Sequence, residues 1–234
     1  MSLKKFSFAS RLRRAQDIHA ILKSFDNYNP PRTEESLTGF QAFIDSLIDT
    51  NNTETNLMKE YRMLVDDRKK VFYKNTHSVN KLFLALKSVV RLQYGKSSTE
   101  LALLDTITDR MKYSKGVKSN EPADNSEQKK SVSHSEKTFG SMTKNFNDFI
   151  TTISGFDSYQ PGQDTFKIDN LKAIAVDLNT KNDAVVEKLT QLRVVKRERL
   201  DLYKQLSDRI NRIKFYVRSK YGANSSEFAQ IRSI

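Results

Sequence analysis

Two short stretches combine residue types that could form a binding site. Residues 25–30 read FDNYNP, and residues 156–161, 131 positions further along, read FDSYQP. A carboxylate beside a phenol offers a hydrogen-bond acceptor next to a group that both donates and accepts. The repetition has two interpretations: a binding site used twice, or a corner that one structural unit needs and that was duplicated with it.

The flanking residues favour the corner. Asp26 and Asp157 can each close an Asx-type turn, and Pro30 and Pro161 prevent a preceding helix from continuing. We expect the aromatic residues of both stretches to pack each corner against a long helix, with Phe156 buried.

One arginine in each half falls on an otherwise apolar helical seam. Arg68 follows Asp67, and Arg199 follows Glu198. Such a residue is either a paired or snorkelling arginine that fixes the register of packed helices, or an anion-binding group inside a bundle. We favour the first interpretation, because structural ion pairs commonly produce this pattern.

Recognised catalytic and metal-binding patterns are missing from the sequence. The chain has no Cys, which excludes disulfides, thiolate metal sites and a cysteine nucleophile. His19, His77 and His134 form no E-x-x-H or H-x-x-x-H pair, and at the offset of 131 the first two correspond to Ile150 and Asp208. There is no Walker loop and no G-x-S-x-G. We expect no enzyme activity, no cofactor and no metal.

Positive charge is the one feature that points toward a ligand. The net charge is +12, and residues 59–96 and 193–220 each contain ten Lys or Arg against three acidic residues. A solvated helix face usually mixes signs, whereas a biased face attracts phosphate polymers, anionic lipid or an acidic protein. The candidate anion contacts are Lys69, Lys70, Lys74, Lys81, Lys87, Arg91, Lys196, Arg197, Lys204, Arg212, Lys214 and Arg218.

Composition and internal repetition predict an all-α protein. Only 7 Gly and 4 Pro occur in 234 residues, and apolar positions match at the offset of 131. Near the ends the offset becomes 127, where YGKSSTEL at 94–101 matches YGANSSEF at 221–228. We predict a tandem duplication with a first helical repeat, a flexible polar linker and a second helical repeat, at 1–112, 113–136 and 137–234.

The element after each YG pair also resembles a known group. Gly95 and Gly222 suit the positive φ that closes a helix, and Ser97 with Glu100 has capping-box spacing. This YG-x-x-S-x-E element resembles uncharacterised bacterial helical-bundle proteins of Bacteroidetes-type genomes. The resemblance implies a helical fold and no assigned activity.

Each repeat is predicted to contain three helices, the third of them very long. The expected ranges are 10–24, 34–49 and 54–94, then 141–154, 165–179 and 183–221. Asn-rich segments, DTNNTE and NTKND, are expected to end the second helices. About 40 residues at 1.5 Å per residue give ~60 Å, so we expect the two long helices to cover each other in an elongated bundle, or to pair in a homodimer.

These features favour a non-catalytic helical scaffold or protein–protein interaction protein, with a protein partner or self-association. The alternative is a basic nucleic-acid-binding protein without sequence specificity, which uses the positive faces of the two long helices. The lack of cysteine suits a cytoplasmic location, and no apolar run approaches the roughly 20 residues of a membrane span. The basic N-terminus is interpreted as mature protein rather than a transit peptide.

Overall fold

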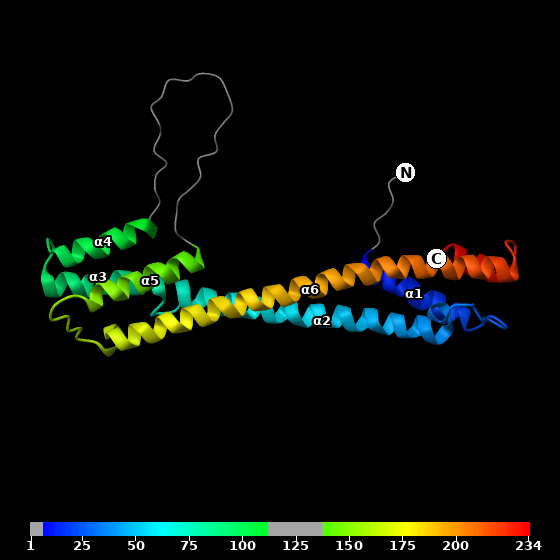
Figure 1. Cartoon of the computed structure of the whole chain (residues 1–234), viewed down its shortest axis with the longest axis horizontal. Helices are drawn as coiled ribbons and strands as arrows, with labels where there is room; N and C mark the ends of the chain where they lie inside the picture. Colours follow the sequence, from blue (N-terminus) through cyan, green and yellow to red (C-terminus); the bar gives the residue numbers. More distant parts are fainter. Residues whose placement is uncertain (1–6, 112–137) are drawn as a thin grey trace, which may run out of the picture. The chain divides into compact units, whose positions relative to one another are not determined.

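The computed structural model describes residues 7–111 and 138–234, and all regular structure in these residues is helical (Figure 1). The all-α prediction is confirmed, whereas the predicted linker 113–136 lies outside the described residues. The α-helices are α1 (Phe8–Leu22), α2 (Leu37–Lys69), α3 (Val79–Tyr94), α4 (Thr99–Met111), α5 (Phe139–Ser154), α6 (Ile168–Tyr221) and α7 (Ser226–Arg232). Shorter pieces are the 3₁₀ turns Thr33–Glu35 and Asp164–Phe166 and the π-helical turn Lys70–Lys74.

The chain divides into two compact units. The first comprises Met1–Glu60 and Lys188–Ile234, and the second comprises Tyr61–Glu187. Helices α2 and α6 contribute to both units, so each unit contains segments of both predicted repeats. The boundaries 1–112 and 137–234 describe sequence similarity and stay a prediction.

The first unit has its core between α1, the first part of α2 and the last part of α6 (Figure 1). The α2 and α6 segments run antiparallel, because Asn51 donates a 2.9 Å hydrogen bond to the Tyr203 hydroxyl while Glu60 pairs with Lys188 at 2.8 Å. Burial of apolar side chains stabilises this arrangement. The fully buried residues include Ile18, Leu22, Phe40, Leu47, Tyr203, Ile213 and Val217.

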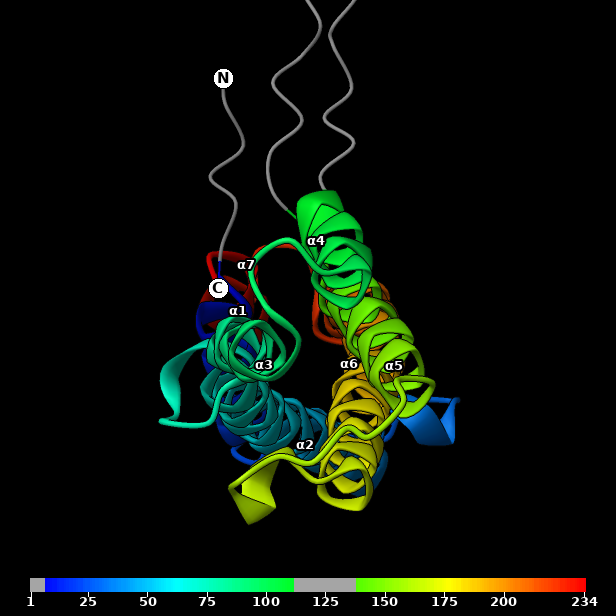
Figure 2. The same cartoon turned by 90° about the vertical axis from the view of Figure 1, so that its left-hand side faces the viewer.

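The second unit has its core between α3, α4, α5 and the first part of α6. Figure 2 shows α3, α4 and α5 next to one another, and α4 contacts both of the others. The ring of Phe83 meets the rings of Phe146 and Phe149 edge to face, with centroids 5.6 and 5.2 Å apart. This aromatic cluster lies inside the core of the unit, where all three side chains are at most 2% exposed.

Hydroxyl side chains cap the N-termini of several helices, because each accepts a hydrogen bond from a backbone N–H of the first turn. Ser7 caps α1, Thr138 caps α5 and Ser225 caps α7. Ser98, rather than the predicted Ser97, accepts the backbone N–H of Leu101 at the start of α4. The predicted capping position was therefore wrong by one residue.

The predicted continuous helix 54–94 is wrong, because the chain leaves the helix between Lys74 and Val79. A π-helical turn ends α2 with a 2.9 Å bond from the Asn75 N–H to the Lys70 carbonyl, and Ser78 precedes α3. Asn, Thr and Ser side chains compete for backbone hydrogen bonds and favour such breaks. In α6 the position matching Asn75 is Leu206, which is buried, and the helix continues.

The Asn-rich segments predicted to end helices are helical instead. DTNNTE lies within α2 and NTKND within α6. The Asn51 amide bonds the Tyr203 hydroxyl, and the Asn182 amide donates to Thr143 Oγ1 at 3.0 Å. Each amide thus donates one hydrogen bond to a neighbouring helix, so packing overrides the low helix propensity of asparagine.

Candidate interaction surface

The two FD-x-Y-x-P corners have a structural role in their units. Tyr28 donates a 2.8 Å hydrogen bond to the carbonyl of Glu35, and Tyr159 donates one of 3.0 Å to the carbonyl of Phe166. Burial raises the pKa of the Tyr159 hydroxyl to about 12, which keeps this donor protonated. Each tyrosine therefore ties its corner to the following 3₁₀ turn.

The same corners are closed by a tyrosine from the end of a helix. Tyr221 donates to the carbonyl of Asp26 at 2.8 Å, and Tyr94 donates to the carbonyl of Asp157 at 2.7 Å. The rings of these tyrosines lie 5.6 and 5.7 Å from Phe25 and Phe156, both edge to face. The expected packing against a long helix is confirmed for the first corner, whereas the second packs against the shorter helix α3.

Two further details of the corners differ from expectation. The backbone carbonyls of the two aspartates make these bonds, and Asn27 and Ser158 take the positive φ of 61° that turns the chain. Phe25 is buried, but Phe156 is only partly buried, so its predicted burial was overestimated.

Arg68 and Arg199 pack within their own units. The guanidinium of Arg68 lies 3.9 Å from the ring centroid of Phe139, and that of Arg199 lies 4.4 Å from the ring centroid of Phe8. Arg199 pairs with Glu54, an acidic residue on the neighbouring helix. The pair of Arg199 with Glu54 agrees with the register-fixing interpretation, whereas Arg68 makes no ion pair among the described residues and donates to Oδ1 of Asn182 at 3.5 Å.

The predicted anion contacts are divided between the two units, and several are neutralised there. Lys70 and Lys74 pair with Asp66 at 3.1 Å, and Lys87 pairs with Asp105. In the first unit, carboxylates pair with Lys204 and Arg212. Among the described residues, exposed cations without an ion pair include Lys69, Arg91 and Arg197. The basic character of the long segments is thus reduced by local pairing.

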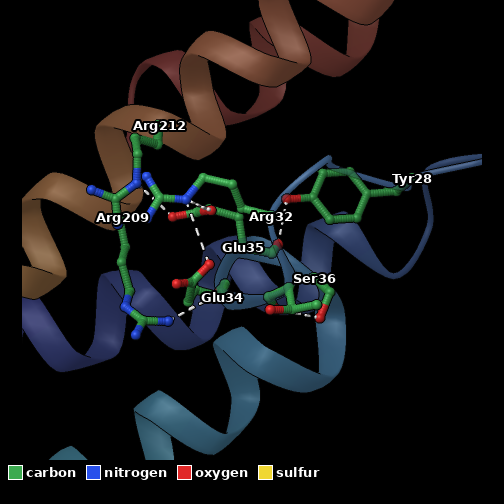
Figure 3. Close-up of polar contacts among 8 residues, drawn as sticks. Tyr28, Arg32, Glu34, Glu35, Ser36, Arg209 and Arg212 are labelled. Atoms are coloured by element: carbon green, nitrogen blue, oxygen red, sulfur yellow. Dashed lines mark hydrogen bonds and ion pairs between the residues drawn. The ribbon is translucent and has the colours of Figure 1, made fainter.

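A buried carboxylate that the sequence analysis missed joins the first 3₁₀ turn to α6 (Figure 3). The Glu35 side chain is 3% exposed, and its oxygens lie 2.5 Å from Nε of Arg212 and 3.6 Å from Nε of Arg32. Arg209 donates to the carbonyl of Glu34 at 2.7 Å. Position 35 corresponds to Phe166 at the offset of 131. This apolar counterpart was the feature of the sequence that could have indicated that Glu35 is buried.

Replacing Glu35 by Ala should lower the free energy of unfolding by about 1–3 kcal/mol. Removing one member of a buried ion pair costs about 3–5 kcal/mol, and the Arg212 side chain is 41% exposed, which reduces the loss. Urea denaturation of Glu35→Ala, Arg212→Met and the double variant checks this. The double variant should lose less stability than the sum of the single variants, and strict additivity would contradict direct pairing.

The outer face of α3 is a candidate interaction surface, because this helix contains Lys and Arg but no acidic residue. Its inner face, with Val79, Leu82, Phe83, Leu86 and Val90, is buried in the core. On the opposite side Leu84 is 65% exposed and Leu92 is 89% exposed. Spacings of three and four residues place them on one face with further exposed side chains. We define the α3 outer face as Lys81, Leu84, Ser88, Arg91 and Leu92.

A groove borders the α3 outer face at Leu92. It has a volume of about 350 Å³ and lies between α3 and the corner that follows α5. Gln93 bridges the two sides, because its amide group donates to the carbonyl of Ser158 and accepts the backbone N–H of Gln160. The described residues that line the groove are uncharged: Val89, Leu92, Gln93, Gln160, Gly162, Gln163 and Phe166.

Comparison with known proteins does not place the chain in a family. No family model, no curated protein and no solved structure matches it. The fold defines the class of protein as an all-α helical bundle. The resemblance to uncharacterised bacterial helical-bundle proteins stays a prediction.

A membrane-spanning helix and a metal-binding cluster are both absent from the residues that the structure describes. None of the helices in 7–111 and 138–234 combines the length and apolar character needed to cross a membrane. In the same residues, no three His, Asp or Glu side chains gather in a way that could hold a metal ion.

Proposed function

We propose that this protein is a non-catalytic helical interaction protein whose α3 outer face binds an acidic amphipathic segment of a protein partner. The observation that supports the proposal is the exposure of Leu84 and Leu92, at 65% and 89%, beside the cations Lys81 and Arg91. Large apolar side chains grouped on one face mark interaction sites more often than single exposed ones do.

Charge complementarity defines the chemistry of the partner. Lys81 and Arg91 flank the two leucines on a helix without acidic residues. A partner helix with leucine-like side chains on one face and carboxylates along its edge would satisfy both features. The uncharged groove beside Leu92 would receive an apolar side chain at one end of this contact.

The proposal is tested by substituting Leu92 with Ser and Arg91 with Gln in the full chain. Proteins captured from the native host at two salt concentrations are identified, purified and titrated against each variant. Leu92→Ser should weaken binding at least tenfold, and Arg91→Gln should weaken it mainly at low salt. Leu200→Ser, which changes an exposed leucine on α6, is the matched control and should bind normally.

The same experiment separates the proposal from the nucleic-acid alternative. Retention that disappears after nuclease treatment and weakens steeply between low and physiological salt would favour nucleic acid. In that case Arg91→Gln should reduce binding while Leu92→Ser should not. Unchanged partner affinity in Leu92→Ser would overturn the proposed role of the α3 outer face.

We also propose that the two repeats arose by tandem duplication. Supporting observations are the contacts that recur 131 residues apart: the two corner tyrosines, the two seam arginines over phenylalanine rings and the two interhelical asparagines. Gly95 and Gly222 add a matching pair, with φ of 99° and 105°. A cytoplasmic location is a separate part of the proposed function, and it rests on the lack of cysteine.

A further inference from the structure

A pocket in the first unit contains a cluster of cations that is separate from the α3 outer face. It lies between α1 and α6 and has a volume of about 180 Å³. Arg11 and Arg14 of α1 and Lys214 of α6 line it, together with Ser207 and Asn211. This volume is well above the roughly 10–15 Å³ that one water molecule requires. The pocket is therefore large enough for a small polar ligand.

The charged residues in the described lining of this pocket are all basic. Among the described residues that line it, three are cationic and none is acidic. Burial, together with the nearby charge of Arg14, lowers the pKa of the Lys214 ammonium. Like charges held close together on partly buried groups disfavour the charged forms, and a bound anion removes this penalty.

Hydrogen bonds hold two of the cations in fixed orientations. Arg11 Nη2 donates to Ser207 Oγ at 2.7 Å and to the carbonyl of Tyr203. Lys214 Nζ donates to the carbonyl of Arg232 at 3.2 Å. A guanidinium has five N–H donors and an ammonium three, so both groups retain donors for a ligand.

The helical bundle does not require cations at these positions. At the offset of 131, the residues that correspond to Arg11 and Arg14 are Met142 and Asn145, and Phe83 corresponds to Lys214. Met142 and Phe83 are buried in the core of the second unit. The equivalent place is thus filled by two apolar side chains and the buried Asn145, whereas the first unit keeps an open pocket lined by cations.

We propose that the pocket formed by Arg11, Arg14 and Lys214 binds a small oxyanion of phosphate type, either free or as a phosphate monoester. Guanidinium groups match the oxygens of phosphate in pairs, and an ammonium adds a point charge. The Asn211 amide lies in the same lining and supplies an uncharged hydrogen-bond donor, while the Ser207 hydroxyl accepts from Arg11 and donates to the carbonyl of Tyr203 at 3.4 Å. This site is independent of the α3 outer face, and its function goes beyond the proposed protein contact.

The test titrates the full chain with inorganic phosphate by calorimetry at constant ionic strength. Wild-type protein should bind one phosphate, and its melting temperature should rise with phosphate concentration because the ligand binds the folded state. Lys214→Gln and Arg14→Gln should each weaken binding at least fivefold. Arg197→Gln, which removes an exposed charge of the same unit, is the matched control and should bind as wild type does.

Circular dichroism first confirms that each variant is folded, and Arg14→Gln provides a second reading if Lys214→Gln is unstable. Glycerol 3-phosphate, and vesicles with phosphatidic acid against phosphatidylcholine alone, separate a free ester from a lipid headgroup. The proposal is overturned if phosphate produces no binding heat at millimolar concentration, or if both pocket variants bind as tightly as Arg197→Gln.

Discussion

Replacing Phe83 by Ala should lower the free energy of unfolding of the second unit by about 3–5 kcal/mol, the usual range for removing a buried phenylalanine. Phe83 is 2% exposed, and its ring meets Phe146 and Phe149 edge to face at interplanar angles of 87° and 82°. Each such ring pair adds about 0.5–1.5 kcal/mol beyond the burial of area. Since α3, α4 and α5 enclose the site, the cavity should not collapse completely.

Chemical denaturation followed by far-UV circular dichroism measures this loss. Leu92→Ala provides the control on the same helix, because Leu92 is 89% exposed and its truncation should change stability by less than about 0.5 kcal/mol. Equal losses for the two variants would show that α3 does not bury the face assigned to it. The contrast also separates the stabilising side of α3 from the side proposed to bind a partner.

Replacing Gly39 by Ala should destabilise the first unit by about 2–3 kcal/mol, because the added methyl group overpacks against backbone atoms. A Cβ at this position would overlap the carbonyl oxygen of Thr33 and lie 3.0 Å from its carbonyl carbon and 3.2 Å from Cα of Glu34. These are backbone atoms of the 3₁₀ turn that precedes α2. Moving this turn would also shift Glu35 away from Arg212.

The comparison variant for Gly39 is Gly140→Ala. Gly140 lies in α5, and none of the described atoms comes within 4 Å of the position that an alanine Cβ would occupy there. Alanine should therefore raise stability by up to about 1 kcal/mol through its helix propensity. Thermal unfolding of both variants measures the two effects. Similar behaviour of Gly39→Ala and Gly140→Ala would rule out the close approach of the turn to α2.

The local elements that the sequence predicted correctly are those set by short-range patterns. Apolar spacing of three and four residues indicated α1, α5 and the buried face of α3, and the prolines marked both corners. The N-cap of α4 was predicted to within one residue. Ser97 and Ser98 both suit this position, and only the point at which the backbone becomes helical decides which of them caps the helix.

The errors occur where long-range packing outweighs local preference. Asn51 and Asn182 favour helix ends on their own, yet amide contacts to neighbouring helices keep both inside long helices. The break between Lys74 and Val79 arises because polar residues occupy it. In α6 the buried Leu206 stands where the break has Asn75, and its packing keeps the chain helical. These contacts cannot be predicted from a single sequence, because they form only when the helices pack against one another.

The candidate sites divide in the same way. The sequence identified the cations of the long segments, but pairing with carboxylates removes several of them from consideration. The exposure of Leu92 was not predictable, because leucine at helical spacing is buried in most helices and only the position of the core shows which face is free. The ion pair of Glu35 with Arg212 joins residues 177 positions apart.

The sequence by itself determined that this protein is helical, where its corners lie and which residues carry its positive charge, because periodicity, proline and charge act locally. Only the tertiary structure decided that the Asn-rich segments are helical, that Phe156 is partly exposed and that Arg11, Arg14 and Lys214 share one pocket. Those outcomes depend on side chains brought together from distant parts of the chain. Their free energies exist only once the helices have packed.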